Sequence, residues 1–115
     1  MAWSAGIDFW DDMGHKIPDM KAALVVHEKF VLEDGAIVEI KAWQVPKNAE
    51  HPEGYKYSMV YIDPQCRRAL GYDNSKRQGH HRHNYDVQTP FEFESIDELM
   101  SRFLSEVKKL RGEPQ

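Results

Sequence analysis

Apolar and polar side chains alternate through the middle of the chain, and this period of two residues predicts β-strands. The first such run, from Ala22 to Leu32, is rich in β-branched residues, and the second extends from Ile37 to Val45. Asp34-Gly35 lies between them and predicts a hairpin, because the turn positions need positive φ. The second run is apolar on one face and charged on the other, so we expect a sheet with one solvated face.

Further strands are predicted beyond a turn-rich stretch from Pro46 to Gly54. Tyr55 to Ile62 is the third strand, and Arg67 to Tyr72 is a short fourth strand that forms a second hairpin with it. Phe91 to Glu94 alternates and could supply a fifth strand. The pattern therefore predicts an antiparallel sheet of four or five strands.

The C-terminal segment predicts an amphipathic helix. Ser95 and Glu98 have the spacing of a capping box, which satisfies backbone donors at a helix start. Gly112 and Pro114 are typical of a helix end. Apolar residues recur between these ends at spacings of three and four: Ile96, Leu99, Met100, Phe103, Leu104, Val107 and Leu110. We expect this stripe to cover the dry face of the sheet, although it could instead bind a partner helix.

These elements define a single α+β domain over residues 21–112. Residues 1–20 lack a clean hydrophobic period, and we interpret them as an irregular N-terminal extension with a short helix around Phe9, Trp10 and Met13. The chain has 41% hydrophobic and 30% charged residues, as is usual for globular proteins. It has one cysteine, no signal-peptide pattern and no apolar run long enough to span a membrane. We therefore expect a cytoplasmic protein.

Charge is distributed unevenly along the chain. The net charge is −4, which by itself argues weakly against nucleic-acid binding. Residues 66–89, however, sum to +3, and they form the only basic segment. Such a segment on an acidic protein is compatible with a local anion site. It could equally be a solvated loop with scattered cations.

Three of the six histidines fall in that basic segment, at His80, His81 and His83. If the chain is extended there, His81 and His83 point to one side and His80 points to the other. Arg82 would then be turned away or reach around the edge. The bland interpretation is a surface loop in which the histidines are incidental polar residues.

Paired imidazoles suit acid–base catalysis, because histidine exchanges protons near neutral pH. Cleavage of RNA by its own 2′-hydroxyl needs a base, an acid and a cation that stabilises the charged phosphorane. His81 and His83 could supply the first two, and Arg82 or Lys56 the third. Asp73 could orient one imidazole through its second nitrogen. Lys56 is either such a phosphate contact or a charge on the solvated face, and we favour the solvated face.

The same residues could instead bind a metal ion, with Asp73 as a third ligand beside the His-x-His pair. Several cations would raise the cost of placing another positive charge here: Arg68, Lys76, Arg77 and Arg82. We therefore favour acid–base chemistry and expect no cofactor.

The order of motifs resembles the TumE family of toxin components. The resemblance covers most of residues 20–110 and depends chiefly on two blocks, Gly71-Tyr72-Asp73-Asn74 and Gly79-His80-His81-Arg82-His83. It also includes the helix entry Ser95-Ile96-Asp97-Glu98-Leu99. The resemblance implies a cytoplasmic toxin that cleaves RNA and an antitoxin partner, often one with a helix-turn-helix domain. It also implies that sequences of the family typically begin near the position of Met20. The family often has an acidic residue at the position of His80, which makes His80 a weaker catalytic candidate than His81 and His83.

We therefore predict a toxin that acts as a metal-independent endoribonuclease. The predicted catalytic residues are His81, His83 and Asp73. The predicted substrate-binding residues are polar and lie in or near the basic segment: Arg82, Lys56, Asn74, Lys76, Arg77 and His80. The alternative is a non-enzymatic protein whose basic, His-rich loop recognises a partner protein or a nucleic acid. An unpaired sheet edge could promote a homodimer.

Overall fold

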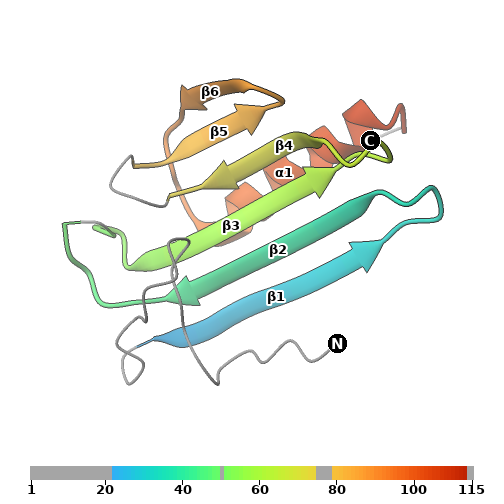
Figure 1. Cartoon of the computed structure of the whole chain (residues 1–115). Helices are drawn as coiled ribbons and strands as arrows, with labels where there is room; N and C mark the ends of the chain where they lie inside the picture. Colours follow the sequence, from blue (N-terminus) through green and yellow to red (C-terminus); the bar gives the residue numbers. More distant parts are fainter. Residues whose placement is uncertain (1–21, 50, 75–78, 114–115) are drawn as a thin grey trace.

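A computed structural model describes residues 22–49, 51–74 and 79–113. Within them, one antiparallel sheet of six strands lies against a single helix (Figure 1). The strands pair in chain order, so each neighbour in the sheet is also the neighbour in sequence. The elements are β1 (Ala23–Val31), β2 (Ile37–Gln44), β3 (Tyr55–Ile62), β4 (Arg68–Asp73), β5 (His81–Asn84), β6 (Val87–Pro90) and α1 (Ile96–Leu110). The α+β prediction is confirmed.

The first hairpin follows from its turn residues. Gly35 has a φ of 90°, which glycine adopts without steric cost. The Asp34 carboxylate accepts a hydrogen bond from the amide of Ala36 at 3.1 Å. This local bond closes the turn, so β1 and β2 pair from Val31 and Ile37 onward.

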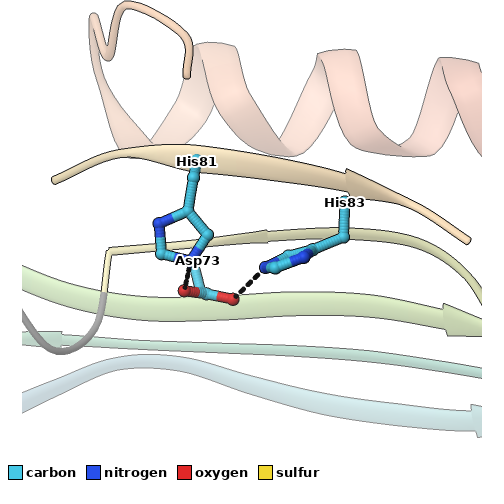
Figure 2. Close-up of side chains that lie close together, drawn as sticks. All are labelled: Asp73, His81 and His83. Atoms are coloured by element: carbon cyan, nitrogen blue, oxygen red, sulfur yellow. Dashed lines mark ion pairs between the residues drawn. The ribbon is translucent and has the colours of Figure 1, made fainter. Parts of the chain in front are cut away.

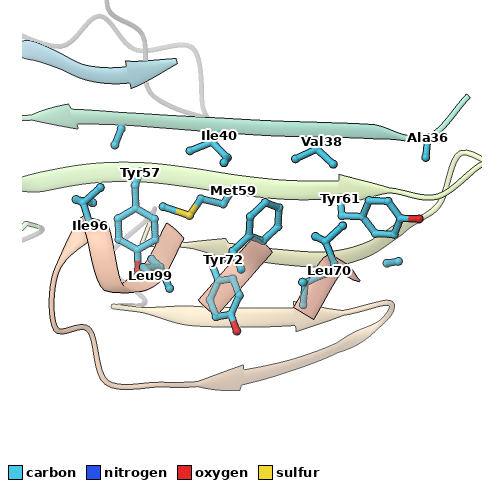
Figure 3. Close-up of a cluster of buried hydrophobic side chains, with 14 residues drawn as sticks. Ala36, Val38, Ile40, Tyr57, Met59, Tyr61, Leu70, Tyr72, Ile96 and Leu99 are labelled. Atoms are coloured by element: carbon cyan, nitrogen blue, oxygen red, sulfur yellow. The ribbon is translucent and has the colours of Figure 1, made fainter. Parts of the chain in front are cut away.

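The core lies between α1 and one face of the sheet (Figure 3). Ser95 accepts a hydrogen bond from the amide of Glu98 at 3.0 Å and caps the helix, as predicted. The Glu98 carboxylate, the other half of the predicted capping box, pairs with Arg102 instead. The apolar stripe of α1 contributes four buried residues: Ile96, Leu99, Phe103 and Val107. They contact alternate residues of the sheet, above all on β3 and β4: Tyr57, Met59, Tyr61, Leu70 and Tyr72. Most of the stripe is therefore core, whereas its members Leu104 and Leu110 are exposed.

The sheet has one strand more than the largest number predicted, and the fifth strand was placed wrongly. Phe91–Glu94 is not a strand. The polar segment His81–Asn84 pairs with β4 instead, and Val87–Pro90 pairs back onto it. Phe91 and Phe93 are partly buried against the core on the way to α1. The alternating phenylalanines therefore pack the segment between β6 and α1 against the core and do not form a strand. The predicted short helix around Phe9–Met13 lies outside the described residues.

Alternation gives the sheet a second face, directed away from α1. Ser58 of β3 is directly opposite Asp73 of β4, and Asp73 is directly opposite His81 of β5. Since directly opposite residues share a face, these side chains form a polar row across three strands. Tyr72 and Arg82, one position along, lie on the helix side.

Candidate functional site

The central feature of the polar face is a carboxylate shared by two imidazoles (Figure 2). The Nε2 atom of His81 lies 2.6 Å from Asp73 Oδ1, and the Nε2 atom of His83 lies 3.2 Å from Asp73 Oδ2. The two rings are nearly perpendicular, with centroids 4.8 Å apart. All three side chains are mostly buried, with exposed fractions of 15%, 5% and 11% for Asp73, His81 and His83. Hereafter these three residues are called the Asp73 cluster.

The hydrogen-bond partners of His83 define its tautomer. Arg68 Nη2 lies 3.2 Å from His83 Nδ1. A guanidinium can only donate, so Nδ1 is the acceptor and the proton is on Nε2, where it points at Asp73. Burial lowers the pKa of His83 and the Arg68 charge lowers it further, while Asp73 acts in the opposite direction. His83 is thus arranged as a neutral ring with a lone pair at Nδ1.

His81 has a different set of partners. Its Nδ1 lies 3.0 Å from the carbonyl oxygen of Gly79, and its Nε2 faces the Asp73 carboxylate. Both partners are acceptors, so a ring with a proton on each nitrogen satisfies both. The Nδ1 atom of His81 thus faces an acceptor and the Nδ1 atom of His83 faces a donor, so the two rings present opposite hydrogen-bond roles, as an acid and a base require.

Gly71 lies beneath this arrangement. It lies directly opposite His83 in the sheet. A Cβ atom on Gly71 would lie 3.4 Å from Arg68 Cδ and 3.7 Å from atoms of the His83 side chain. These are ordinary van der Waals distances, so the side chains of Arg68 and His83 pack directly over Gly71.

Arg68 is the functional candidate that sequence reasoning left out of the predicted site. Its position depends on a register shift in the β3–β4 pairing, where Ile62 is opposite Arg68 but Tyr61 is opposite Leu70. Ala69 is therefore an extra residue on β4. No local pattern signals such a bulge, although Gly71 within a strand run was a hint of close approach.

Arg82 is not brought to the Asp73 cluster. It lies on the helix side, where Nη2 contacts Glu106 Oε2 at 2.9 Å. The same carboxylate accepts a hydrogen bond from the hydroxyl of Tyr72, which Figure 3 shows among the core side chains. Burial, together with Glu106, raises the pKa of Tyr72 to about 12. This trio joins β4, β5 and α1, so Arg82 contributes to helix docking.

His80 is also directed away from the cluster, as the alternation predicted. Its Nδ1 lies 2.8 Å from the hydroxyl of Tyr57, and its Nε2 lies 2.9 Å from Glu53. Its ring stacks on Phe93 with centroids 4.7 Å apart. His80 therefore belongs to an aromatic stack at the edge of the core.

The remaining predicted binding residues have different positions. Asn74 is buried, and its amide group bonds the backbone of β3 at Tyr57 and Tyr55, which extends the pairing of β4 by one step. Lys56 is buried on the polar face, two positions from Ser58 on β3. Lys76 and Arg77 lie outside the described residues.

The Asp73 cluster could also hold a metal ion, because its ligand atoms all lie within 4.8 Å of one another. The bond from His81 to Gly79 fits that role, since metal-binding imidazoles commonly donate their second nitrogen to a carbonyl. Arg68 argues against it. A metal on His83 Nε2 requires a proton on Nδ1, and that proton would point at a group that only donates. The contact with Arg68 therefore favours an ion-paired cluster over a metal site.

Within the described part of the chain, no helix is long and apolar enough to cross a membrane. No curated protein and no solved structure matches the chain significantly. One family does match: the family described as Toxin TumE, over residues 15–111. That span includes the Asp73 cluster, Arg68 and α1, and membership of a toxin family implies an antitoxin partner. The chain therefore belongs to the TumE family of toxins, as its motif order predicted.

Proposed function

We propose that this toxin is an endoribonuclease that cleaves RNA by attack of the 2′-hydroxyl on the adjacent phosphate. The observation that supports the proposal best is one carboxylate, Asp73, contacting Nε2 of both His81 and His83. A shared carboxylate holds both rings by the same nitrogen, so the chemistry would use the Nδ1 atoms, which contact Arg68 and the carbonyl of Gly79 in this structure. This is the orienting role that the aspartate has in catalytic triads.

In the proposed reaction His83 is the general base. Its Nδ1 carries a lone pair and would accept the proton of the 2′-hydroxyl. Its lowered pKa keeps the ring neutral at pH 7, as a base must be. Arg68 touches that nitrogen and would move its guanidinium to the phosphate, where charge increases in the transition state.

His81 is the general acid. Its Nδ1 proton, held at the carbonyl of Gly79, would pass to the leaving 5′-oxygen. Asp73 stabilises the charged ring through Nε2 at 2.6 Å until the proton leaves. The products would be a 2′,3′-cyclic phosphate and a 5′-hydroxyl.

Lys56 lies on the same face as the cluster but is only 6% exposed, so it would have to extend out of the sheet surface to contact the RNA backbone. Lys76 and Arg77, which lie between β4 and β5 in the sequence, are proposed to make further contacts with that backbone. We further propose that the toxin acts in the cytoplasm. The antitoxin would mask this face, and a helix-turn-helix antitoxin is the expected kind.

The test compares purified parent, His81→Ala and His83→Ala proteins on a defined single-stranded RNA in buffer with excess EDTA. Both variants should cleave at least about 100-fold more slowly, and mass spectrometry should find cyclic phosphate ends. His27→Ala is the matched control, because His27 pairs with Glu39 at 3.0 Å on β1 and β2, away from the cluster. Parental activity in both cluster variants would contradict the proposal, and activity lost in EDTA would favour the metal.

The alternative is a protein that acts by binding alone. The burial of the Asp73 cluster supports this alternative, since a buried ion pair can be purely structural. It predicts a stoichiometric complex with the antitoxin and growth arrest that survives His81→Ala and His83→Ala. Expression of each variant with and without the antitoxin, followed by gel filtration, separates the two functions.

A further inference from the structure

A cleft of about 560 Å³ is lined by Arg67, Arg68, Tyr85 and Asp86. Tyr85 and Asp86 form the two-residue turn between β5 and β6, because Asn84 and Val87 are the last pair of that hairpin. Arg67 and Arg68 come from the start of β4 and the turn before it. The cleft is therefore framed by two neighbouring turns of the sheet.

Arg68 connects this cleft to the proposed chemistry. Its side chain lines the cleft, while its Nη2 lies 3.2 Å from His83 Nδ1. A phosphate bound at Arg68 would thus lie between the proposed base and the cleft. A nucleotide with its phosphate there would have its sugar and base on the cleft side.

The aromatic wall of the cleft is built on an unusual backbone. Tyr85 has a φ of 51°, a conformation that glycine adopts most readily and that is uncommon for a large side chain. The residue is 41% exposed. The Arg67 guanidinium lies 5.2 Å from the ring centroid and is itself paired with Asp63 at 3.0 Å. A tyrosine at a position that favours glycine, held by a guanidinium yet accessible, has the properties of a stacking surface for a base.

Asp86 adds a directional acceptor to this wall. It is exposed and lines the cleft, and its side chain makes no hydrogen bond or ion pair within the part of the chain that the structure describes. Its two carboxylate oxygens can accept two parallel hydrogen bonds. Among the four RNA bases, guanine alone presents two adjacent donors on its Watson–Crick edge, at N1 and at the exocyclic amine.

We propose that this cleft is a guanine subsite, in which Tyr85 stacks on the base, Asp86 accepts from its Watson–Crick edge and Arg68 binds the 3′-phosphate. The inference rests on the proposed ribonuclease function, since it places that phosphate beside His83. The toxin would then cleave RNA on the 3′ side of guanosine.

Binding is measured first, without any cleavage. The full chain is titrated with the 3′-monophosphates of guanosine, adenosine, cytidine and uridine and with inorganic phosphate, and amide NMR signals of residues 84–88 are followed. Guanosine 3′-monophosphate should bind at least tenfold more tightly than the other three. Tyr85→Gly keeps a residue suited to positive φ and removes the ring, so it should weaken nucleotide binding about tenfold and leave phosphate binding unchanged. Asp86→Asn should abolish the preference for guanine.

Equal affinity for all four nucleotides, or parental nucleotide binding by Tyr85→Gly, would overturn the subsite. Mapping cleavage sites on a mixed-sequence RNA separates this inference from the proposed function. Guanosine-selective binding by a protein that cleaves nothing would refute the ribonuclease and leave the subsite intact. Cleavage that is indifferent to the base and to Asp86→Asn would refute the subsite alone.

Discussion

Replacement of Asp73 by asparagine tests the reasoning about proton positions. The substitution keeps the shape of the side chain but exchanges two acceptor oxygens for one acceptor and one donor. His83 can still donate from Nε2 to the amide oxygen. The amide nitrogen must then donate to Nε2 of His81, which can accept only as a neutral ring. The variant therefore remains hydrogen-bonded, and it loses the charged state of the proposed acid.

The expected loss of stability follows from the two contacts. Hydrogen bonds to charged groups contribute roughly 1.5–3 kcal/mol and neutral ones roughly 0.5–1.5 kcal/mol. Each of the bonds at 2.6 Å and 3.2 Å thus loses about 1 kcal/mol. The free energy of unfolding should fall by about 2 kcal/mol, which lowers the Tm of a domain of this size by about 10 °C. The cleavage rate should fall further, by about 10²- to 10⁴-fold, because general acid catalysis is lost.

The assay combines thermal unfolding, RNA cleavage below the Tm and ¹⁵N NMR of the histidine rings at neutral pH. His81 should show two protonated ring nitrogens in the parent and one in the variant. Glu39→Gln makes the same exchange opposite His27, at 3.0 Å, and should leave cleavage unchanged. A folded Asp73→Asn protein that cleaves at the parental rate, or whose His81 ring remains doubly protonated, would refute the reasoning.

Three further predictions concern charge, pH and the core. Arg68→Ala should reduce the cleavage rate at least about 100-fold with little change in Tm, because Arg68 contacts His83. Arg82→Ala should lower the Tm and leave the cleavage rate unchanged, because Arg82 pairs with Glu106 on the helix side. A loss of cleavage in Arg82→Ala with a loss of Tm in Arg68→Ala would show that the two roles are the reverse. The pKa of His83 is lower in the folded protein than in the unfolded chain, so the unfolded chain takes up a proton at a higher pH. The free energy of unfolding should therefore fall as the pH drops below about 6.5, and this group should not affect it above that pH. In urea unfolding between pH 5 and 8, the free energy of unfolding should depend less steeply on pH in His83→Gln than in the parent. Phe103→Ala should lower the free energy of unfolding by about 3–5 kcal/mol, because Phe103 is fully buried. Leu104, which is 38% exposed, is the control, and Leu104→Ala should lower the free energy of unfolding much less in the same denaturation experiment.

Relations between residues close in the chain were predictable from the sequence. The hairpin at Asp34-Gly35 and the cap at Ser95 form, because each is completed by bonds within a few residues, although only Gly35 of the two turn residues has positive φ. The common direction of His81 and His83 follows from strand alternation alone. The apolar stripe of α1 required a cover, and the sheet provided it.

Relations between distant residues were decided by tertiary structure. The pairing of β5 with β4 places Asp73 opposite His81, and nothing in the spacing of eight residues requires that partner. The extra residue in β4 brings Arg68 to His83. Docking of α1 engages Arg82 through Glu106. Alternation could assign each side chain to a face, but register and helix docking determine which groups come into contact on that face. Local sequence thus determined that His81 and His83 face the same side. The tertiary fold determined that Asp73 and Arg68 are their partners.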